Sequence, residues 1–306
     1  MPAGTSRGRL NGNAGLILNP AAGKGAARRR LEKITQSFAA FGIRHIKQTR
    51  ARGDEERLTR EAIDEGWTTI AVVGGDGTCS RVAHTLVSSH ADCALAVVPA
   101  GTGNDFAKTL GVTDHDTHQL AALIAAGNST VIDVGRADGR HFVNSCGFGF
   151  DASVLEASTR VRFLSGDAVY IYAALSQLFT YRGLSVAIDE AASGDVLMVT
   201  ISNGRSLGGV FLIAPSASVT DGELDACVVR DAGLLERVRL FAAAIRGTHE
   251  GMKPVRTFKT RSLSLGFNAP PAIELDGELH QAQSADVTIE CIPRALRVIA
   301  SPEARL

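Results

Sequence analysis

Short apolar runs alternate with amphipathic stretches over the first 135 residues. AGLILN from residue 14, TTIAVVG from residue 68 and CALAVVP from residue 93 are nearly continuous apolar runs, and residues 43–49 form a fourth extended candidate. Such runs are typical of strands that are buried on both faces of a parallel sheet. Between them, apolar residues recur at helical spacing, as at Leu31, Ile34 and Phe38. The alternation predicts an open, mostly parallel α/β sheet over residues 14–135.

The pattern changes near Arg136. One helical insertion is predicted from Ala152 to about Phe179 and another helix from about Leu234 to Ile245, whereas the rest reads as short extended runs separated by turn residues. This spacing predicts an antiparallel β-sandwich over residues 136–306, whose last residues can pack back on the first domain. Residues 1–13 are expected to form a flexible tail.

Composition and charge narrow the class of protein. The 32 Lys and Arg residues balance the 32 Asp and Glu residues, so no global field attracts nucleic acid or an anionic bilayer. The five cysteines are scattered and include no CxxC pair, which argues against a disulfide framework and a zinc site. No signal peptide and no apolar run of ~20 residues is evident. The sequence therefore predicts a cytoplasmic protein that contacts lipid only peripherally.

Three glycine-rich turns each follow a predicted strand of the first domain. Their sequences are Asn19-Pro-Ala-Ala-Gly23-Lys24-Gly25, Gly74-Gly75-Asp76-Gly77-Thr78 and Pro99-Ala-Gly101-Thr102-Gly103-Asn104-Asp105. Because the carboxyl ends of parallel strands meet at one edge of a sheet, we expect the turns to lie together. Glycine lets a backbone N–H approach a phosphate closely, and the following helix adds unsatisfied N–H groups. The pattern predicts a phosphate site, although glycine often does no more than end a strand.

None of these turns fits the GxxxxGK[ST] or GxGxxG patterns. NPAAGKG, VVGGDGT and PAGTGNDFAKTLG resemble instead the three motifs of the diacylglycerol kinase catalytic family, which includes sphingosine, ceramide and bacterial lipid kinases. NSCGFGFDASV, SNGRSLGGVFLIAPSASVTDGELDACVV and ELDGEL are similar to later blocks of that family, in the same order. The resemblance runs from about Gly15 to Ile299. GGDGT alone is shared with NAD kinases and phosphofructokinases, whereas GTGNDFA together with APSASVTDGELD is specific to the lipid kinases.

This resemblance implies a nucleotide-binding domain like that of NAD and diacylglycerol kinases over residues 14–135, followed by a lipid-binding β-sandwich. It implies transfer of the γ-phosphoryl group of ATP, with Mg²⁺, to the hydroxyl of diacylglycerol or a related lipid at the membrane surface. A homodimer is one option for the assembly. The residues that the resemblance places at the nucleotide are Asn19, Pro20, Gly23, Lys24, Thr49, Gly74, Gly75, Asp76, Gly77, Thr78, Thr102, Asn104 and Asp105.

The resemblance also implies metal ligands. Asp76 would hold the catalytic Mg²⁺, and Asp221 would hold a structural Mg²⁺ in the second domain. Ser218 and Glu223 would complete that second site, in part through backbone carbonyls. Carboxylate and phosphate oxygens are the ligands that Mg²⁺ prefers, and phosphoryl transfer depends mainly on positioning and charge neutralisation.

An acid of the Asp276-Gly277-Glu278 segment would accept the proton of the lipid hydroxyl. Glu278 is the favoured acceptor and Asp276 the alternative.

Simpler interpretations stand beside these roles. Asp76 could cap the helix that follows it, and Asp221-Gly222 and Asp276-Gly277 could be hairpin turns. Two other functions also fit the motifs. One is an NAD kinase, and the other is a non-catalytic nucleotide- or lipid-binding protein on the same fold.

The helical insertion carries basic and aromatic residues that suit a membrane surface. Ordinary packing against the sandwich is the alternative. The residues concerned are Arg160, Arg162, Phe163, Tyr170, Tyr172, Phe179, Tyr181 and Arg182.

Overall fold

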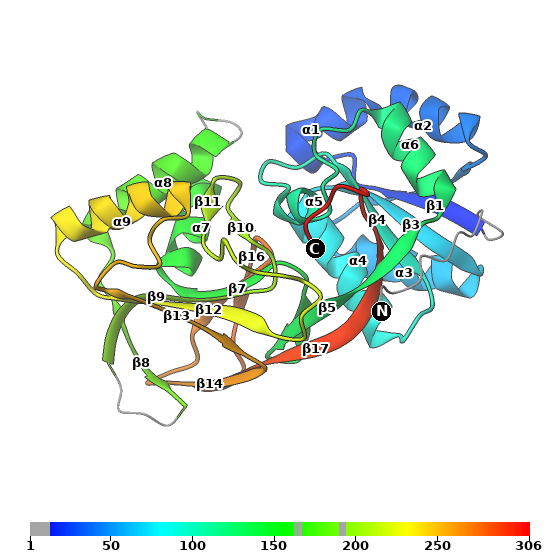
Figure 1. The fold of residues 1–306 in the computed structure, drawn as a ribbon. Helices are drawn as coiled ribbons and strands as arrows, with labels where there is room; N and C mark the ends of the chain where they lie inside the picture. The colour runs from blue at the N-terminus through cyan, green and yellow to red at the C-terminus, as the bar shows by residue number, and fades with distance from the viewer. Residues whose placement is uncertain (1–12, 162–163, 165–166, 190–193) are drawn as a thin grey trace. The chain divides into compact units, whose positions relative to one another are not determined.

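A computed structural model describes residues 13–161, 164, 167–189 and 194–306. The chain forms two compact units (Figure 1). Unit 1 contains the chain up to Ile132 together with Arg294–Leu306, and unit 2 contains Asp133–Pro293. Residues 1–12 of the predicted tail lie outside the described residues, and Asn13 already belongs to the first strand.

Unit 1 is built on a parallel sheet in the order β2-β1-β3-β4, and the end of β17 adds a parallel strand beside β4. Its strands are β1 (Asn13–Leu18), β2 (His45–Gln48), β3 (Trp67–Gly74) and β4 (Ala94–Pro99). Its helices are α1 (Ala22–Arg29), α2 (Leu31–Ala40), α3 (Asp54–Asp64), α4 (Asp76–Ser88), α5 (Asp105–Thr109) and α6 (Thr117–Ala126). The predicted α/β architecture is confirmed.

Local sequence explains these elements. Leu16, Ile70 and Leu95 of the central strands are fully buried because helices cover both faces of the sheet. The α6 helix begins with a capping box, in which the Asp116 side chain accepts from the Gln119 N–H, and it ends at Gly127.

The first glycine-rich segment differs from its prediction as a turn. Residues from Ala22 onward form α1, and Gly23 and Gly25 lie within this helix with φ of 58° and 84°. The buried Ala27 methyl group anchors the helix to the core, and alanine favours helix on intrinsic grounds. Only Asn19 to Ala21 remain as the connection.

Unit 2 is an antiparallel β-sandwich, as the sequence predicted. Its strands are β5 (Ser129–Ala137), which begins in unit 1, β6 (Arg140–Phe142), β7 (Ser145–Gly149), β8 (Leu184–Ile188), β9 (Gly194–Ser202), β10 (Ser206–Leu207), β11 (Phe211–Leu212), β12 (Leu224–Arg230), β13 (Val255–Thr260), β14 (Ser262–Phe267), β15 (Ala272–Leu275), β16 (Glu278–Gln281) and β17 (Asp286–Ile299), which ends in unit 1. Neighbours such as β7–β9, β9–β12 and β14–β17 run antiparallel. One core fills the sandwich around Phe142, Phe148 and Ile289.

Three helices, α7 (Phe150–Arg160), α8 (Asp167–Thr180) and α9 (Leu234–Arg246), cover the other face of β9 and β12. The sequence predicted one helical insertion where the structure has α7 and α8. The α7 helix ends because Val161 adopts an extended conformation, with φ of −79° and ψ of 109°. None of the helices in the described part of the chain is long and apolar enough to cross a membrane.

Candidate active site

The ends of β1, β3 and β4 carry polar side chains that are bonded to one another. The Asn19 side chain donates to the Thr78 hydroxyl at 3.0 Å and accepts from the Ala21 N–H at 3.0 Å. The Asn19 N–H donates to the Val73 carbonyl at 2.9 Å, so the first loop is attached to β3. Thr78 lies in the first turn of α4. The predicted residues Asn19 and Thr78 therefore share one site.

Two glycine loops touch backbone to backbone at this edge. A Cβ atom added to Gly101 would lie 2.4 Å from the Cα of Gly75, and one added to Gly75 would lie 3.0 Å from the Cα of Gly101. A Cβ on Gly74 would meet the Thr78 side chain at 2.6 Å. Glycine is required at these positions because a Cβ atom would prevent the close approach of the neighbouring backbone or side chain. We call Asn19, Gly74–Thr78 and Gly101–Asp105 the glycine edge.

Asn104 and Asp76 fix the third loop. Asn104 adopts the left-handed conformation, and its amide side chain bonds the N–H and the carbonyl of Gly101 at 2.9 and 3.1 Å. The Asp76 carboxylate, at the start of α4, accepts from the Phe106 N–H at 3.2 Å. Asp76 therefore caps the first turn of α5, the helix of the neighbouring loop. Asp105 is buried and pairs with Lys108 at 3.2 Å.

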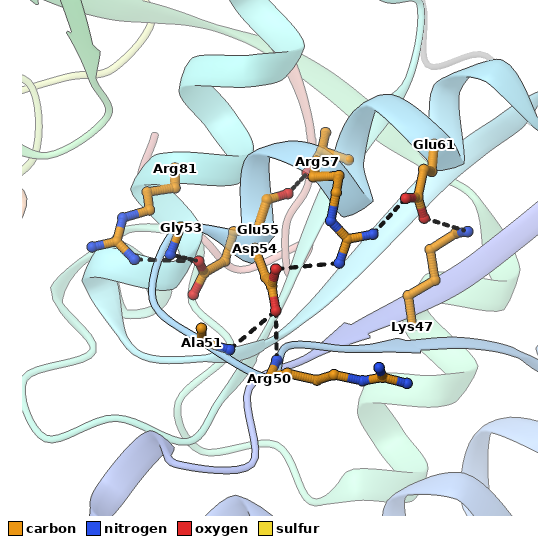
Figure 2. Close-up of polar contacts among 10 residues, drawn as sticks. Lys47, Arg50, Ala51, Gly53, Asp54, Glu55, Arg57, Glu61 and Arg81 are labelled. Carbon is orange, nitrogen blue, oxygen red and sulfur yellow. Dashed lines mark hydrogen bonds and ion pairs between the residues drawn. The ribbon is translucent and has the colours of Figure 1, made fainter.

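Thr49 follows β2, is 8% exposed, and donates its N–H to the Leu18 carbonyl at 2.9 Å. The loop after it is held by the first turn of α3 (Figure 2). Asp54 accepts from the N–H groups of Arg50 and Ala51 at 2.7 and 3.0 Å. The 1%-exposed Glu55 accepts from the Gly53 N–H at 3.0 Å and pairs with Arg81 at 3.2 Å.

Asp54, Glu55 and Arg81 were missed by sequence reasoning. The available signal was Gly53 followed by three acids, a pattern that is typical of a helix start. Arg81 lies on α4, so the Glu55–Arg81 pair connects the loop after β2 with the helix that begins at the glycine edge.

The remaining predicted nucleotide residues lie on the same loops. Pro20, Gly77 and Thr102 are half-buried there. Gly23 is in α1, and the Lys24 side chain lies outside what the structure describes.

The Asp276-Gly277 pair of unit 2 forms the hairpin turn between β15 and β16, with positive φ at both residues. Asp276 is 2% exposed, and its carboxylate accepts three backbone N–H groups, from Val143 at 2.8 Å, Asn144 at 2.8 Å and Ser145 at 3.0 Å. This acid therefore joins the turn to the start of β7. Its oxygens are engaged in holding the backbone.

Two more buried acids lie beside this turn. Glu274 accepts from the Gly277 N–H at 2.5 Å, and the Thr200 hydroxyl donates to Asp151. A Cβ on Gly147 would lie 2.8 Å from an Asp151 oxygen and 3.1 Å from a Glu274 oxygen, so glycine makes room for both. Burial raises the pKa of Asp151 to about 7, which the Thr200 hydrogen bond only partly offsets. We call Asp151, Glu274 and Asp276 the carboxylate cluster.

Glu278 differs from the cluster because it is half-buried at the start of β16, opposite Leu275 in the hairpin. Of the two acids predicted as proton acceptors, it is the one that is not buried beneath the turn.

The predicted structural metal ligands lie in the loop before β12. The Asp221 carboxylate accepts from the Glu223 N–H at 3.1 Å and pairs with Lys259 at 2.6 Å. Lys259 also reaches Asp225 at 3.2 Å. Burial lowers the pKa of the Lys259 ammonium, but its hydrogen bonds to the two aspartates outweigh this and leave the pKa raised. Ser218 bonds Thr220.

The side chains of both predicted acidic ligands face basic groups as arranged. Glu223 faces Arg261 at 3.7 Å, and among the described residues no three acidic, His or Cys side chains converge as a metal site. A lysine neutralises the loop instead. The buried Asp133 supports it, because its carboxylate accepts from the Gly222 N–H at 2.7 Å.

Asp76 is the other residue that the sequence predicts as a metal ligand. It is a single half-buried carboxylate beside helix N–H groups. Mg²⁺ in phosphoryl-transfer sites is commonly held by one or two carboxylates, with phosphate oxygens and water as the other ligands. The residues at the glycine edge fit a cation that arrives with a nucleotide.

Comparisons with known proteins identify the family of this chain. Residues 13–137 match the family model described as the diacylglycerol kinase catalytic domain. Residues 144–300 match the model described as the YegS C-terminal NAD kinase beta sandwich-like domain. The chain belongs to the diacylglycerol kinase family. It is 32% identical over 298 residues to a Stenotrophomonas maltophilia protein named "Probable lipid kinase YegS-like", an alignment that covers 92% of this chain and 94% of that protein.

Other family members are similar over most of their length. The chain is 27% identical to a diacylglycerol kinase of Bacillus subtilis over 270 residues, which covers 87% of this chain and 89% of the relative. A crystal structure of a diacylglycerol kinase from Bacillus anthracis superposes with a TM-score of 0.71 at 25% identity, and the match covers 95% of this chain and 98% of that one. The fold and the kinase family are thereby established together.

Proposed function

We propose that this protein transfers the γ-phosphoryl group of ATP to a lipid hydroxyl, with diacylglycerol as the first acceptor to test. The observation that carries the proposal is the glycine edge, where Gly75 and Gly101 are in backbone contact. The α4 helix begins directly after Gly75 at this contact. A helix start presents unsatisfied N–H groups, and the helix dipole favours negative charge there.

Residues at and beside the edge have separate roles in this proposal. Asn19 and Thr78 fix the first loop against α4, and Thr49 closes the nucleotide site on the β2 side. Asn104 holds Gly101 so that the third loop keeps its shape. Asp76 is the proposed ligand of Mg²⁺, which would supply charge neutralisation on the phosphate oxygens.

Glu278 is the proposed proton acceptor. The lipid hydroxyl gives its proton to the Glu278 carboxylate while its oxygen forms a bond to the γ-phosphorus. The bond from the γ-phosphorus to the bridging oxygen breaks at the same time, so the products are the lipid phosphate and ADP, and the proton passes from Glu278 to water. Asp276 is the weaker candidate, because its carboxylate already accepts three N–H groups.

The test is transfer of labelled γ-phosphate from ATP with Mg²⁺ to a panel of lipids in mixed micelles. Wild type should label one lipid class. Glu278→Gln should lower kcat by roughly 10²–10⁴-fold, the usual range for loss of a general base, and leave the melting temperature unchanged. Asp76→Asn should lower activity and weaken nucleotide binding. Asp286→Asn removes an exposed acid of the same unit and serves as the matched control.

Other results would redirect the proposal. Labelling of NAD instead of any lipid would identify a small-molecule kinase, and tight ATP binding without transfer would favour a binding protein. Full activity of Glu278→Gln would reject Glu278 as the base.

A further inference from the structure

Helices α8 and α9 expose apolar side chains on one face of unit 2. Phe179 and Leu235 are each 66% exposed and Leu234 is 48% exposed. Large apolar residues gathered on a surface, rather than scattered, mark an interaction site. We call this set the α8–α9 face; it consists of Tyr172, Leu175, Phe179, Leu234, Leu235 and Val238.

These side chains do not take part in the core of unit 2. The inward side of the same helices is already packed, because Ala173, Ala174 and Leu178 of α8 and Leu240 of α9 are buried in the cluster over β9 and β12. The exposed residues recur on the opposite side at helical spacing, as at Leu175 and Phe179. The packing alternative for the insertion therefore holds for its inner side only.

Arg237 locks the two helices together. This 9%-exposed residue of α9 donates to the Leu178 and Tyr181 carbonyls at the end of α8, at 3.1 and 2.8 Å. It also pairs at 2.6 Å with Asp231, in the stretch before α9. The end of α8 and the start of α9 are consequently held side by side (Figure 1).

A surface hollow of about 490 Å³ lies where the helices meet. Phe179 and Leu234 line it from the two helices, and Arg182 lines it from the residue stretch after α8. Its lining is mixed, because Thr180 and Arg237 contribute polar groups beside the apolar side chains.

Exposed arginines flank the face, and the one acid within α9, Glu236, is half-buried. Arg182, Arg239 and Arg246 are exposed, and within the described part of the chain they form no ion pair. Leu235, Arg239 and Arg246 share one side of α9 by helical spacing, so apolar and basic groups point the same way. The long arginine side chains can contact headgroups while the leucines enter the acyl boundary. Among the sequence-predicted membrane residues, Arg162 and Phe163 lie outside the described residues.

We propose that the α8–α9 face docks this protein on an anionic bilayer. The inference rests on the proposed function, because a kinase of a long-chain lipid must reach its acceptor in a membrane. Phe179, Leu234 and Leu235 enter the acyl boundary, and Arg182 and Arg239 contact anionic headgroups. Neither the overall charge, which is zero, nor a spanning helix among the described residues provides this contact.

The test is flotation with vesicles of phosphatidylcholine alone and of phosphatidylcholine with phosphatidylglycerol. Wild type should bind the mixed vesicles and release them as salt rises. Phe179→Ser with Leu235→Ser should weaken binding at least tenfold, because each lost apolar anchor is expected to lower the partition coefficient roughly tenfold. Ile46→Ser, which removes a 37%-exposed apolar residue of unit 1, should bind like wild type.

Arg182→Glu with Arg239→Glu gives an independent test that leaves the apolar packing in place. It should weaken binding to mixed vesicles and abolish the salt dependence. Phosphorylation of a short-chain, water-soluble diacylglycerol should stay within twofold of wild type in both double variants. This readout separates docking from catalysis and shows that the variants are folded.

Unchanged vesicle binding of both double variants would overturn the proposal. A wild-type dimer that Phe179→Ser with Leu235→Ser converts to a monomer, without a change in vesicle binding, would instead assign the face to a second copy of the chain. If no lipid is phosphorylated but both double variants still lose vesicle binding, the proposed kinase function fails and the docking face stands.

Discussion

The glycine edge of unit 1 and the carboxylate cluster of unit 2 use the same residue pair, Asp-Gly, for opposite purposes. At Asp76-Gly77 the acid stays half-buried and the surrounding backbones approach through Gly75 and Gly101, where we propose the nucleotide site. At Asp276-Gly277 the acid is buried and accepts three N–H groups. An acid in a motif is therefore a ligand site only where its partners leave room for one.

The largest expected effect is on the carboxylate cluster. Asp276→Asn keeps the left-handed turn but replaces one acceptor oxygen with a donor that faces the Val143 N–H. Loss of the charged acceptor is expected to lower the free energy of unfolding by about 4–5 kcal/mol. Urea denaturation measures this, with Asp286→Asn as the exposed control. A change below 1 kcal/mol would show that Asp276 does not hold the turn.

The raised pKa of Asp151 predicts that the stability of the protein depends on pH. Its pKa rises from 3.8 to about 7 on folding, so between these values the native state keeps a proton that the unfolded state has released. Stability should fall as pH rises through this window and change no further above about pH 7. A shift of about three units corresponds to at most ~4 kcal/mol. Asp151→Asn should flatten this dependence in denaturation measured from pH 4 to pH 8, whereas an unchanged slope would assign it to other groups.

Gly101→Ala tests the glycine edge. The new methyl group would meet the Gly75 backbone at 2.4 Å, so one loop has to move. We expect a stability loss of about 1–3 kcal/mol and at least tenfold weaker ATP binding by calorimetry. Gly251→Ala, where a Cβ meets nothing within 4 Å, is the matched control. Normal ATP binding by Gly101→Ala would place the nucleotide elsewhere.

Lys259→Met gives the smallest expected effect. Lys259 and Asp221 are 37% and 31% exposed, so loss of their pair should cost no more than about 1 kcal/mol. The variant leaves Asp221 and Asp225 without their cation, and Mg²⁺ should then raise its melting temperature more than that of wild type. Stabilisation of wild type by Mg²⁺ that disappears in Asp221→Asn would support the predicted metal site instead.

Secondary-structure patterns predicted most of the fold, and they failed where tertiary contacts override local preference. The β3 and β4 strands were predicted because burial on both faces leaves a continuous apolar run. The β13 sequence, VRTFKT, is largely polar and contains no apolar run that marks a strand, so its strand conformation depends on pairing with β12. The α1 helix was taken for a turn because its glycines resemble a loop.

In the candidate site, too, some residues were predicted from local sequence and others depend on tertiary contacts. Asn19, Asp76 and Asn104 were predicted from motifs, because the glycines beside them form recognisable sequence patterns. Glu55, Arg81 and Asp151 were not found, because a buried charge is recognised only by the partner that satisfies it, and these partners are far away in the sequence.

The sequence by itself determined the two-domain class, the family and the loops that form the glycine edge, because these depend on residue order along single segments. Only the tertiary structure distinguished the three Asp-Gly pairs: Asp76 against the start of α5, Asp221 against Lys259, and Asp276 beneath its own turn. The reason is physical, since the availability of a carboxylate depends on which distant N–H or ammonium groups the fold brings to it. The α8–α9 face was likewise found only from the tertiary structure. Exposed and buried apolar residues are of the same types, and only their exposure in the fold distinguishes them.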